Sequence, residues 1–312
     1  MTNILIFIIA ILVIATLVQI VRVSELLSEI KNKDVNEVTD KDNNTQGLLF
    51  LVVGFGFLIF VIWQMITWNH LLLPPASSVH GTQIDLLMKV SMGLIIVVFF
   101  ITSPMLFYFA FKYRGKKSNN AYFLSHNNKL EVVWTVIPTI ILTVLIIFGL
   151  KTWDNSMNVQ VTESTKLIEV YAKQYNWTAR YSGLDNKLGK ANYKLVKGKN
   201  TLGVDMLDVN SADDKMAREV HLVVNEPVLL KFRSQDVIHS AFLPHFRVQM
   251  NCVPGITTQF GFTPNKTTAQ MKESEGEDFE YVLLCNKICG ASHFNMQMKF
   301  IVETQEEYDI WI

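Results

Sequence analysis

The chain divides into an apolar first half and a second half of short segments. Four long apolar runs, nearly free of charge, lie before residue 151, and none follows. They are Ile4–Val21, Gly47–Trp63, Val90–Phe111 and Val132–Leu150. A helix rises about 1.5 Å per residue, so each run can cross the roughly 30 Å hydrocarbon core of a membrane. Because the polar loops between the runs are short, the pattern predicts four transmembrane helices rather than buried helices of a soluble protein.

The charges of the connecting loops predict the orientation of these helices. The loop from Asn69 to Met88 contains no Lys or Arg, whereas its neighbours are basic. The first loop carries Arg22, Lys31, Lys33 and Lys41, and the third carries Lys112, Arg114, Lys116, Lys117 and Lys129. Cytoplasmic loops are enriched in such residues. We therefore expect an integral protein of a bacterial inner membrane, with both termini and everything after Lys151 on the extracytoplasmic side.

The first apolar run also has the alternative interpretation of a signal peptide. No basic residue precedes it, and its apolar stretch is longer than is usual for such a peptide. Both features favour a retained helix.

Beyond Lys151 the pattern changes to short β-branched and aromatic segments separated by proline and glycine turns. The expected strands are Leu167–Tyr171, Val220–Val224, Val228–Phe232, Gln259–Phe262, Tyr281–Leu284 and Gln297–Val302. This arrangement is typical of a small antiparallel sandwich or barrel. A lysine-rich polar stretch from Ser182 to Arg218 interrupts it, and we interpret that stretch as a solvated surface insertion.

The chemistry of the chain is concentrated in one segment, Cys285 to Met296. The formal net charge of zero gives no indication of a nucleic-acid partner, and three cysteines are too few for a disulfide scaffold. The segment holds Cys285, Cys289, His293 and Met296, whose sulfur and imidazole groups suit copper or zinc. The residues alone leave open a disulfide, a zinc site, a single blue copper, or two coppers bridged by both thiolates.

A metal site of this kind needs a second imidazole from elsewhere in the domain. His239 follows Asp236, Val237 and Ile238 at the end of the strand that begins near Val228. We expect a loop to carry it to the edge of the sheet. His245 competes for this role, whereas His221 begins a strand and is interpreted as structural.

Several motifs together resemble subunit II of the haem-copper cytochrome c oxidases. They are Leu130 to Pro138, Asp236 to Ser240, Val253-Pro254-Gly255 and the segment from Cys285 to Met296, in that order. The resemblance implies a transmembrane helical anchor carrying an all-β cupredoxin-like barrel with a binuclear CuA centre. The domains implied are an N-terminal extension with two helices (1–84), a helix hairpin (85–153) and the copper domain (154–312), with its insertion at about 182–218.

Carried over by position, the resemblance implies a ligand set. Cys285 and Cys289 would bridge the coppers, His239 and Met296 would complete one ion, and His293 with the backbone carbonyl of Lys287 would complete the other. Met298 is an alternative to Met296 by proximity.

The resemblance also implies a role for Glu131, at the mouth of a proton-uptake path in subunit I. A carboxylate in the first turn of a helix, where the macrodipole favours it, is an equally good interpretation of this residue.

The chain departs from the family pattern at three places. Lys287 stands where relatives have a Glu that helps to hold magnesium at the subunit I interface. An ammonium group has no acceptor, so we expect this magnesium to be absent or differently held. Tyr175 stands where relatives have the Trp at which electrons enter, with Trp177 matching the second aromatic. Cys252 replaces a usual Ala, and we expect a small buried side chain.

The resemblance implies a subunit of a proton-translocating oxidoreductase. It would take electrons from a c-type cytochrome and pass them to haems held only by subunit I, where oxygen is reduced to water. Subunit I, other oxidase subunits and membrane lipid would be its partners. The alternatives are the CuA subunit of a membrane nitric-oxide reductase, or a membrane-anchored module with a structural metal or disulfide.

Overall fold

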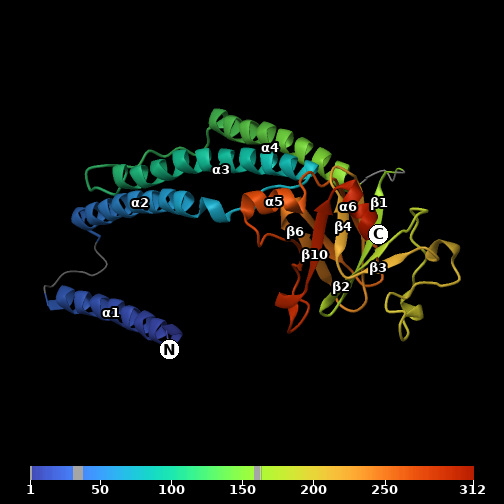
Figure 1. Ribbon diagram of the computed structural model, residues 1–312. Helices are drawn as coiled ribbons and strands as arrows, with labels where there is room; N and C mark the ends of the chain where they lie inside the picture. The colour runs from blue at the N-terminus through green and yellow to red at the C-terminus, as the bar shows by residue number, and fades with distance from the viewer. Residues whose placement is uncertain (1, 31–37, 158–161, 163) are drawn as a thin grey trace. The chain divides into compact units, whose positions relative to one another are not determined.

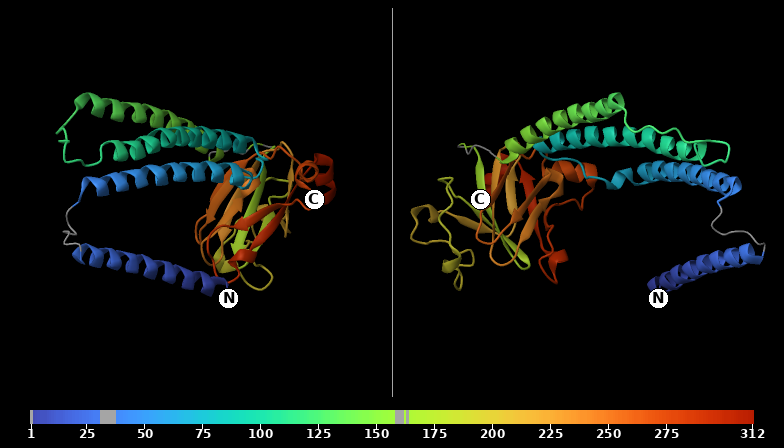
Figure 2. Two further views of the ribbon diagram at one scale, coloured as in Figure 1. Left: turned by 90° about the vertical axis from the view of Figure 1, so that its left-hand side faces the viewer. Right: turned by 180° about the vertical axis from the view of Figure 1, so that it is seen from behind.

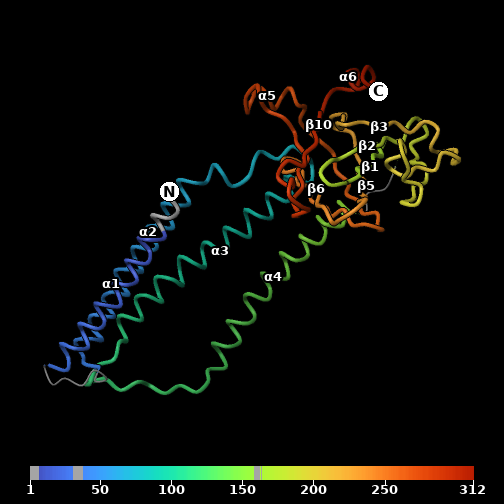
Figure 3. Tube along the Cα trace, turned by 90° about the horizontal axis from the view of Figure 1, so that it is seen from below, coloured from blue at the N-terminus to red at the C-terminus, as the bar shows by residue number. Residues whose placement is uncertain are grey.

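The computed structural model describes residues 2–30, 38–157, 162 and 164–312. The chain forms two compact units, each assembled from two segments. The first comprises Met1–Thr67 and Ile96–His126, and the second comprises Trp68–Ile95 and Asn127–Ile312. The trace in Figure 3 follows the chain through its long helices into the β domain.

Four long helices account for the apolar half of the chain. They are α1 (Thr2–Ile30), α2 (Asp40–Trp68), α3 (Val79–Lys112) and α4 (Asn128–Met157). Each is long and apolar enough to cross a membrane, and most of its large apolar side chains are exposed. The prediction of four membrane helices is confirmed. Lys31 and Lys33, which entered the prediction of orientation, lie outside the described residues.

Local chemistry explains two features of these helices. Asn127 caps α4, because its side-chain Oδ1 accepts the backbone N–H of Leu130 at 3.1 Å. Glu131 lies in the first turn of α4 and is exposed. Within the first unit, α2 packs on α3 through a glycine: a Cβ at Gly54 would lie 2.2 Å from the Phe107 ring.

The second half of the chain forms a β domain of two five-stranded sheets (Figure 1). The first sheet has the order β3 (Lys215–Ala217), β2 (Asn176–Tyr181), β1 (Lys166–Lys173), β5 (Val228–Ser234) and β8 (Thr258–Phe262). The second has the order β4 (Val220–Val223), β10 (Gln297–Glu303), β9 (Tyr281–Cys285), β6 (His239–Leu243) and β7 (Val248–Cys252). The core includes the buried side chains of Ile168, Leu222, Leu230 and Phe300.

The pairing of the strands corrects one expectation. The all-β class is confirmed, but the sheets are mixed rather than antiparallel, because β1 pairs with β5 and β10 with β4 in parallel. In each sheet the parallel pair joins strands far apart in sequence. Short turns between neighbouring segments give no sign of such pairings, since parallel strands require a long crossover connection.

Four strands were missed by the sequence pattern, namely β2, β3, β6 and β7. In β2 the polar residue Arg180 is buried, because its side chain pairs with Glu169 at 2.7 Å and with Asp214 at 2.8 Å. A buried ion pair breaks the alternation of apolar and polar residues on which the prediction depends.

The insertion is anchored more firmly than a solvated loop. It contains the short 3₁₀-helices η2 (Tyr193–Leu195) and η3 (Val209–Ser211). Leu202 and Val204 are buried in a small cluster with Tyr171 of β1. The guanidinium of Arg180 also donates to the carbonyl of Gly189 at 2.9 Å.

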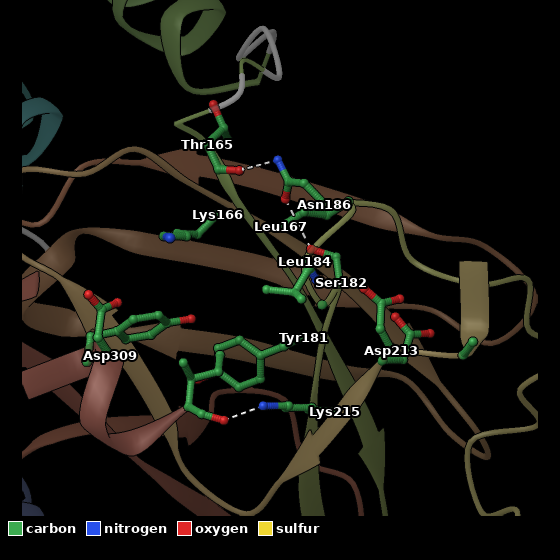
Figure 4. Close-up of a pocket in the computed structure, with 15 residues that line it drawn as sticks. Thr165, Lys166, Leu167, Tyr181, Ser182, Leu184, Asn186, Asp213, Lys215 and Asp309 are labelled. Carbon is green, nitrogen blue, oxygen red and sulfur yellow. Dashed lines mark hydrogen bonds between the residues drawn. The ribbon is translucent and has the colours of Figure 1, made fainter. Parts of the chain in front are cut away.

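Two further helices complete the domain. They are α5 (Thr268–Glu275) and α6 (Gln305–Trp311), and each begins with a capping box. A cavity of about 490 Å³ lies between α6 and the insertion, lined by residues that include Tyr181, Asp213 and Asp309 (Figure 4). None of the sulfur or imidazole groups proposed as metal ligands lines this cavity.

Candidate metal centre

One loop between two neighbouring strands carries most of the candidate ligands. Strand β9 ends at Cys285, and the chain returns through the 3₁₀-helix η5 (His293–Asn295) into β10. The backbone N–H of Cys285 donates to the carbonyl of Met296 at 3.1 Å and closes the loop. This closure brings the first and last candidate ligands of the segment side by side.

The side chains of the loop converge on the two cysteines. The Sγ atoms of Cys285 and Cys289 lie 3.9 Å apart. From Cys289 Sγ, His293 Nδ1 is at 3.6 Å and Met296 Sδ is at 3.8 Å. The carbonyl oxygen of Lys287 lies 3.3 Å from Cys285 Sγ, while the lysine side chain is exposed. The loop therefore gathers two thiols, an imidazole, a thioether and a carbonyl oxygen.

The two thiols are free and buried. A disulfide needs a sulfur–sulfur distance of about 2.05 Å, so the disulfide alternative is wrong for this structure. Burial and the neighbouring Cys285 raise the pKa of the Cys289 thiol to about 11. Both thiols must lose their protons to bind a metal, so metal binding at this site releases protons.

His239 provides the second imidazole. Its Nδ1 lies 3.8 Å from Cys285 Sγ, and its ring is fully buried. The ligand atoms of His239, Cys285 and Cys289 all lie within 4.8 Å of one another. His239 was expected near the end of the strand that begins at Val228, and this was wrong. That strand, β5, ends at Ser234, and His239 begins the next strand, β6, after a turn.

A carboxylate orients this imidazole. Asp236 Oδ1 lies 2.9 Å from His239 Nε2, and its Oδ2 accepts the backbone N–H of Gln174 at 2.8 Å. Although burial raises the pKa of the Asp236 carboxyl, these hydrogen bonds outweigh burial and lower it. In the sequence, the signal for this role of Asp236 is its position three residues before the candidate ligand His239.

The two aromatic residues proposed for electron transfer lie at different depths. Tyr175 is 36% exposed, and its hydroxyl accepts the backbone N–H of Ala291 at 3.0 Å. Trp177 is 1% exposed; its ring centroid lies 6.0 Å from that of His239, and its indole N–H donates to the carbonyl of Met296 at 3.4 Å. Of the two, only Tyr175 can contact another protein.

Gln174 fixes the same turn to the ligand loop, because its side-chain amide donates to the carbonyl of Cys289. This contact was not anticipated from the sequence.

Other candidates lie away from the cluster. The ring of His245 packs against Phe279 and Tyr281. His221 stacks on Trp311, with ring centroids 3.9 Å apart. Among the described residues, no contact joins the Met298 sulfur to either candidate thiol.

Cys252 is fully buried, which confirms the expectation for it. Burial raises the pKa of its thiol to about 12.

The fold and the site together define a membrane-anchored, cupredoxin-like subunit with a buried cluster of soft metal ligands. Two family models match the chain: the transmembrane domain of cytochrome c oxidase subunit II over residues 66–152, and its periplasmic domain over residues 167–304. The chain therefore belongs to the cytochrome c oxidase subunit II family.

Individual relatives are similar over most of their length. The alternative cytochrome c oxidase subunit 2 of Bradyrhizobium diazoefficiens is 27% identical over 269 residues, which cover 85% of this chain and 90% of the relative. Cytochrome c oxidase subunit 2 of Synechocystis is 25% identical over 283 residues, covering 85% and 81%. The crystal structure of the periplasmic domain of subunit II from Bradyrhizobium japonicum is 25% identical, with a TM-score of 0.32, covering 47% of this chain and 89% of that one.

Proposed function

We propose that the cluster around Cys285 and Cys289 holds a binuclear copper centre through which this oxidase subunit relays electrons. Cys285 and Cys289 would bridge the ions, with His239 and Met296 on one and His293 and the Lys287 carbonyl on the other. Two soft thiols and two imidazoles within reach of one another suit copper, and a second thiol is surplus for a single blue copper. When bound, such a pair supplies a carrier for one electron.

The protein supplies the environment of that carrier. Burial of the two thiols and of His239 excludes water, and the closed loop holds the ligands in place. Asp236 fixes the His239 ring so that Nδ1 faces the thiols. A preorganised site of this kind needs little rearrangement when its charge changes.

The direction of electron flow follows from the membrane anchor. With the β domain and both termini on the extracytoplasmic side, an external c-type cytochrome would deliver electrons at Tyr175, beneath which Trp177 lies. Electrons would then pass to the haems of subunit I. Glu131, exposed in the first turn of α4, would lie at the cytoplasmic end of a proton-uptake path in that subunit.

The convergence of His239, His293 and Met296 on two free thiols carries this proposal. We would purify the complete oxidase, measure its copper and zinc contents, and record its electron paramagnetic resonance spectrum. A mixed-valence copper pair gives a spectrum that zinc or a single copper cannot give. We expect His239→Ala to abolish this spectrum and His245→Ala, the matched control, to leave it unchanged. Stoichiometric zinc, or a single-copper spectrum in the unaltered protein, would contradict the proposal.

A further inference from the structure

A strongly basic surface of the β domain lies on the insertion. Residues 186–204 contain five lysines and no Asp or Glu, and we name this segment the basic platform. The lysines are Lys187, Lys190, Lys194, Lys197 and Lys199, and all five are exposed. Among the ion pairs of the described residues, none involves any of them. The positive charge of the platform is therefore available to a partner.

The acidic residues that flank the platform lie at its two edges, where their carboxylates accept hydrogen bonds from backbone amides. Asp208 Oδ2 accepts the N–H of Lys190 at 2.8 Å, and Asp185 Oδ1 accepts the N–H of Lys187 at 2.8 Å. Asp205 Oδ1 likewise accepts the N–H of Leu207 at 3.0 Å.

The platform is held rigidly on the β domain. Leu202 and Val204 pack against Tyr171, and an isolated bridge pairs Val204 with Ala191. Arg233 donates to the carbonyl of Leu202 at 3.2 Å, and its guanidinium lies 4.8 Å from the Tyr171 ring centroid. A preorganised surface loses little conformational entropy on binding, which favours its use as an interface.

The platform is continuous with the surroundings of the metal centre. A groove of about 590 Å³ runs beside it, lined by Tyr193, Arg233, Gln235 and Ile256 among others. Gln235 immediately precedes Asp236, which orients His239. In Figure 1, and seen from behind in Figure 2, the insertion and the loop after β9 both extend downward, on opposite sides of the strands.

Of the charges beside the platform, Lys173 adds to its positive charge and Asp236 opposes it. Lys173, beside the Gln174–Tyr175 turn, is exposed, whereas the Asp236 carboxylate is occupied by hydrogen bonds to Gln174, Val237 and His239.

We propose that the basic platform docks an electron-donor protein whose contact face is acidic, so that its redox group lies over Tyr175. This inference rests on the proposed function, because it names the class of partner that uses the same site. Complementary charge steers such a donor to the groove beside Asp236 and raises its association rate. A donor with a basic contact face is repelled.

The test uses the purified oxidase and two c-type cytochromes of similar potential, one acidic and one basic, as donors. Stopped-flow reduction is measured over a range of ionic strength. We expect faster reduction by the acidic cytochrome, slowing as salt is added because screening shortens the range of the attraction. In Lys194→Glu/Lys197→Glu, reduction by the acidic cytochrome should fall about tenfold at low salt. Lys266→Glu/Lys272→Glu, near and on α5, is the matched control and should change it less than twofold.

Three results would overturn the proposal: faster reduction by the basic cytochrome, equal effects of the two double variants, or no dependence on salt. Tight binding of anionic lipid vesicles through Lys194 and Lys197, without any effect on donor oxidation, would assign the platform to a membrane instead. The copper spectrum of each variant is recorded in parallel. Absence of that spectrum from the unaltered oxidase would refute the copper centre itself. If the Lys194→Glu/Lys197→Glu variant keeps both the spectrum and the donor kinetics of the unaltered oxidase, only the docking role is refuted.

Discussion

The imidazole of His239 is held between a carboxylate and a thiol: Nε2 lies 2.9 Å from Asp236 Oδ1, and Nδ1 lies 3.8 Å from Cys285 Sγ. An ionised carboxylate only accepts hydrogen bonds, so Nε2 carries the proton and Nδ1 presents its lone pair to the thiols. The pairing thus selects the ring tautomer that can bind a metal.

Replacing Asp236 with Asn should weaken copper binding. An amide can donate to Nε2 and so stabilise the wrong tautomer, and the backbone N–H groups of Gln174 and Val237 lose a charged acceptor. We expect copper affinity to fall about 10- to 100-fold, as for other partners of metal-binding histidines. Competition with a copper chelator measures the affinity. Asp278→Asn, an exposed carboxylate on another loop, is the control, and equal affinities in the two variants would contradict the orienting role.

Met296 and Met298 provide a matched pair for the axial position. Met296 Sδ lies 3.8 Å from Cys289 Sγ, whereas Met298 is buried within β10. Met296→Leu should keep the fold but shift the reduction potential and the visible spectrum of the copper centre, because an axial ligand tunes both. Met298→Leu should change neither. A redox titration followed by absorbance distinguishes them, and a shift in the Met298 variant alone would reverse the assignment.

The helices and the ligand loop could be predicted from the sequence because their signals are local. The start of β6 and the anchoring of the insertion could not, because they depend on contacts between distant segments. Membrane helices need long apolar runs, and the cysteine loop is local, so both are visible in consecutive residues. The start of β6 at His239 depends on pairing with Cys252 and its neighbours in β7. The anchoring of the insertion depends on Arg180 and Tyr171, which lie in β2 and β1. Contacts between distant segments such as these leave no periodic pattern.

A substitution at Lys287 should change magnesium binding and leave copper binding unchanged. Only its backbone oxygen approaches Cys285, so Lys287→Glu should leave the copper spectrum unchanged. A carboxylate at this exposed position offers magnesium the oxygen ligand that an ammonium cannot. We expect the unaltered complex to lack stoichiometric magnesium at this position and the variant to gain affinity for it. Elemental analysis, with manganese as a paramagnetic probe, checks both expectations. Stoichiometric magnesium beside Lys287 in the unaltered complex would refute this prediction.

Cys252 should be dispensable for metal binding. Its thiol is fully buried, and burial raises its pKa to about 12, so it remains protonated at neutral pH. Cys252→Ala should therefore retain the full copper content while losing about 1 kcal/mol of stability from the smaller side chain. Cys289→Ala, by contrast, should lose the copper pair. Copper analysis of the two purified variants decides the matter, and a loss of copper from the Cys252 variant would make it a ligand.

Glu169 joins the β sheet to the insertion through two arginines. Its carboxylate pairs with Arg180 at 2.7 Å and also with Arg233, and Arg180 in turn holds the Gly189 carbonyl of the insertion. Burial raises the pKa of the Glu169 carboxyl, but the two guanidinium groups outweigh burial and hold the pKa below the ordinary value of 4.5. The folded state therefore favours the ionised carboxylate.

This depressed pKa gives the stability of the β domain a defined dependence on pH. The contribution of Glu169 is fully present above pH 4.5, the unfolded value, and is lost as the pH falls through the lower pKa of the folded state. Glu169→Gln leaves Arg180 with Asp214 as its one carboxylate partner among the ion pairs of the described residues and removes the carboxylate that pairs with the partly buried Arg233, so we expect it to lose about 3 kcal/mol at pH 7. The deficit should shrink as the pH falls below 4.5, because the unaltered protein then loses the same interaction.

Thermal unfolding of the purified complex, followed through the copper absorbance, measures the deficit at each pH. Glu280→Gln is the matched control, because its pair with Lys299 is about half exposed and should contribute less than about 1 kcal/mol. Burial raises the pKa of the Asp214 carboxyl, so that residue acts with the opposite sign and cannot mimic the effect. A deficit that stays constant from pH 7 to pH 4, or one equal to that of Glu280→Gln, would show that the Glu169 pair does not stabilise the domain.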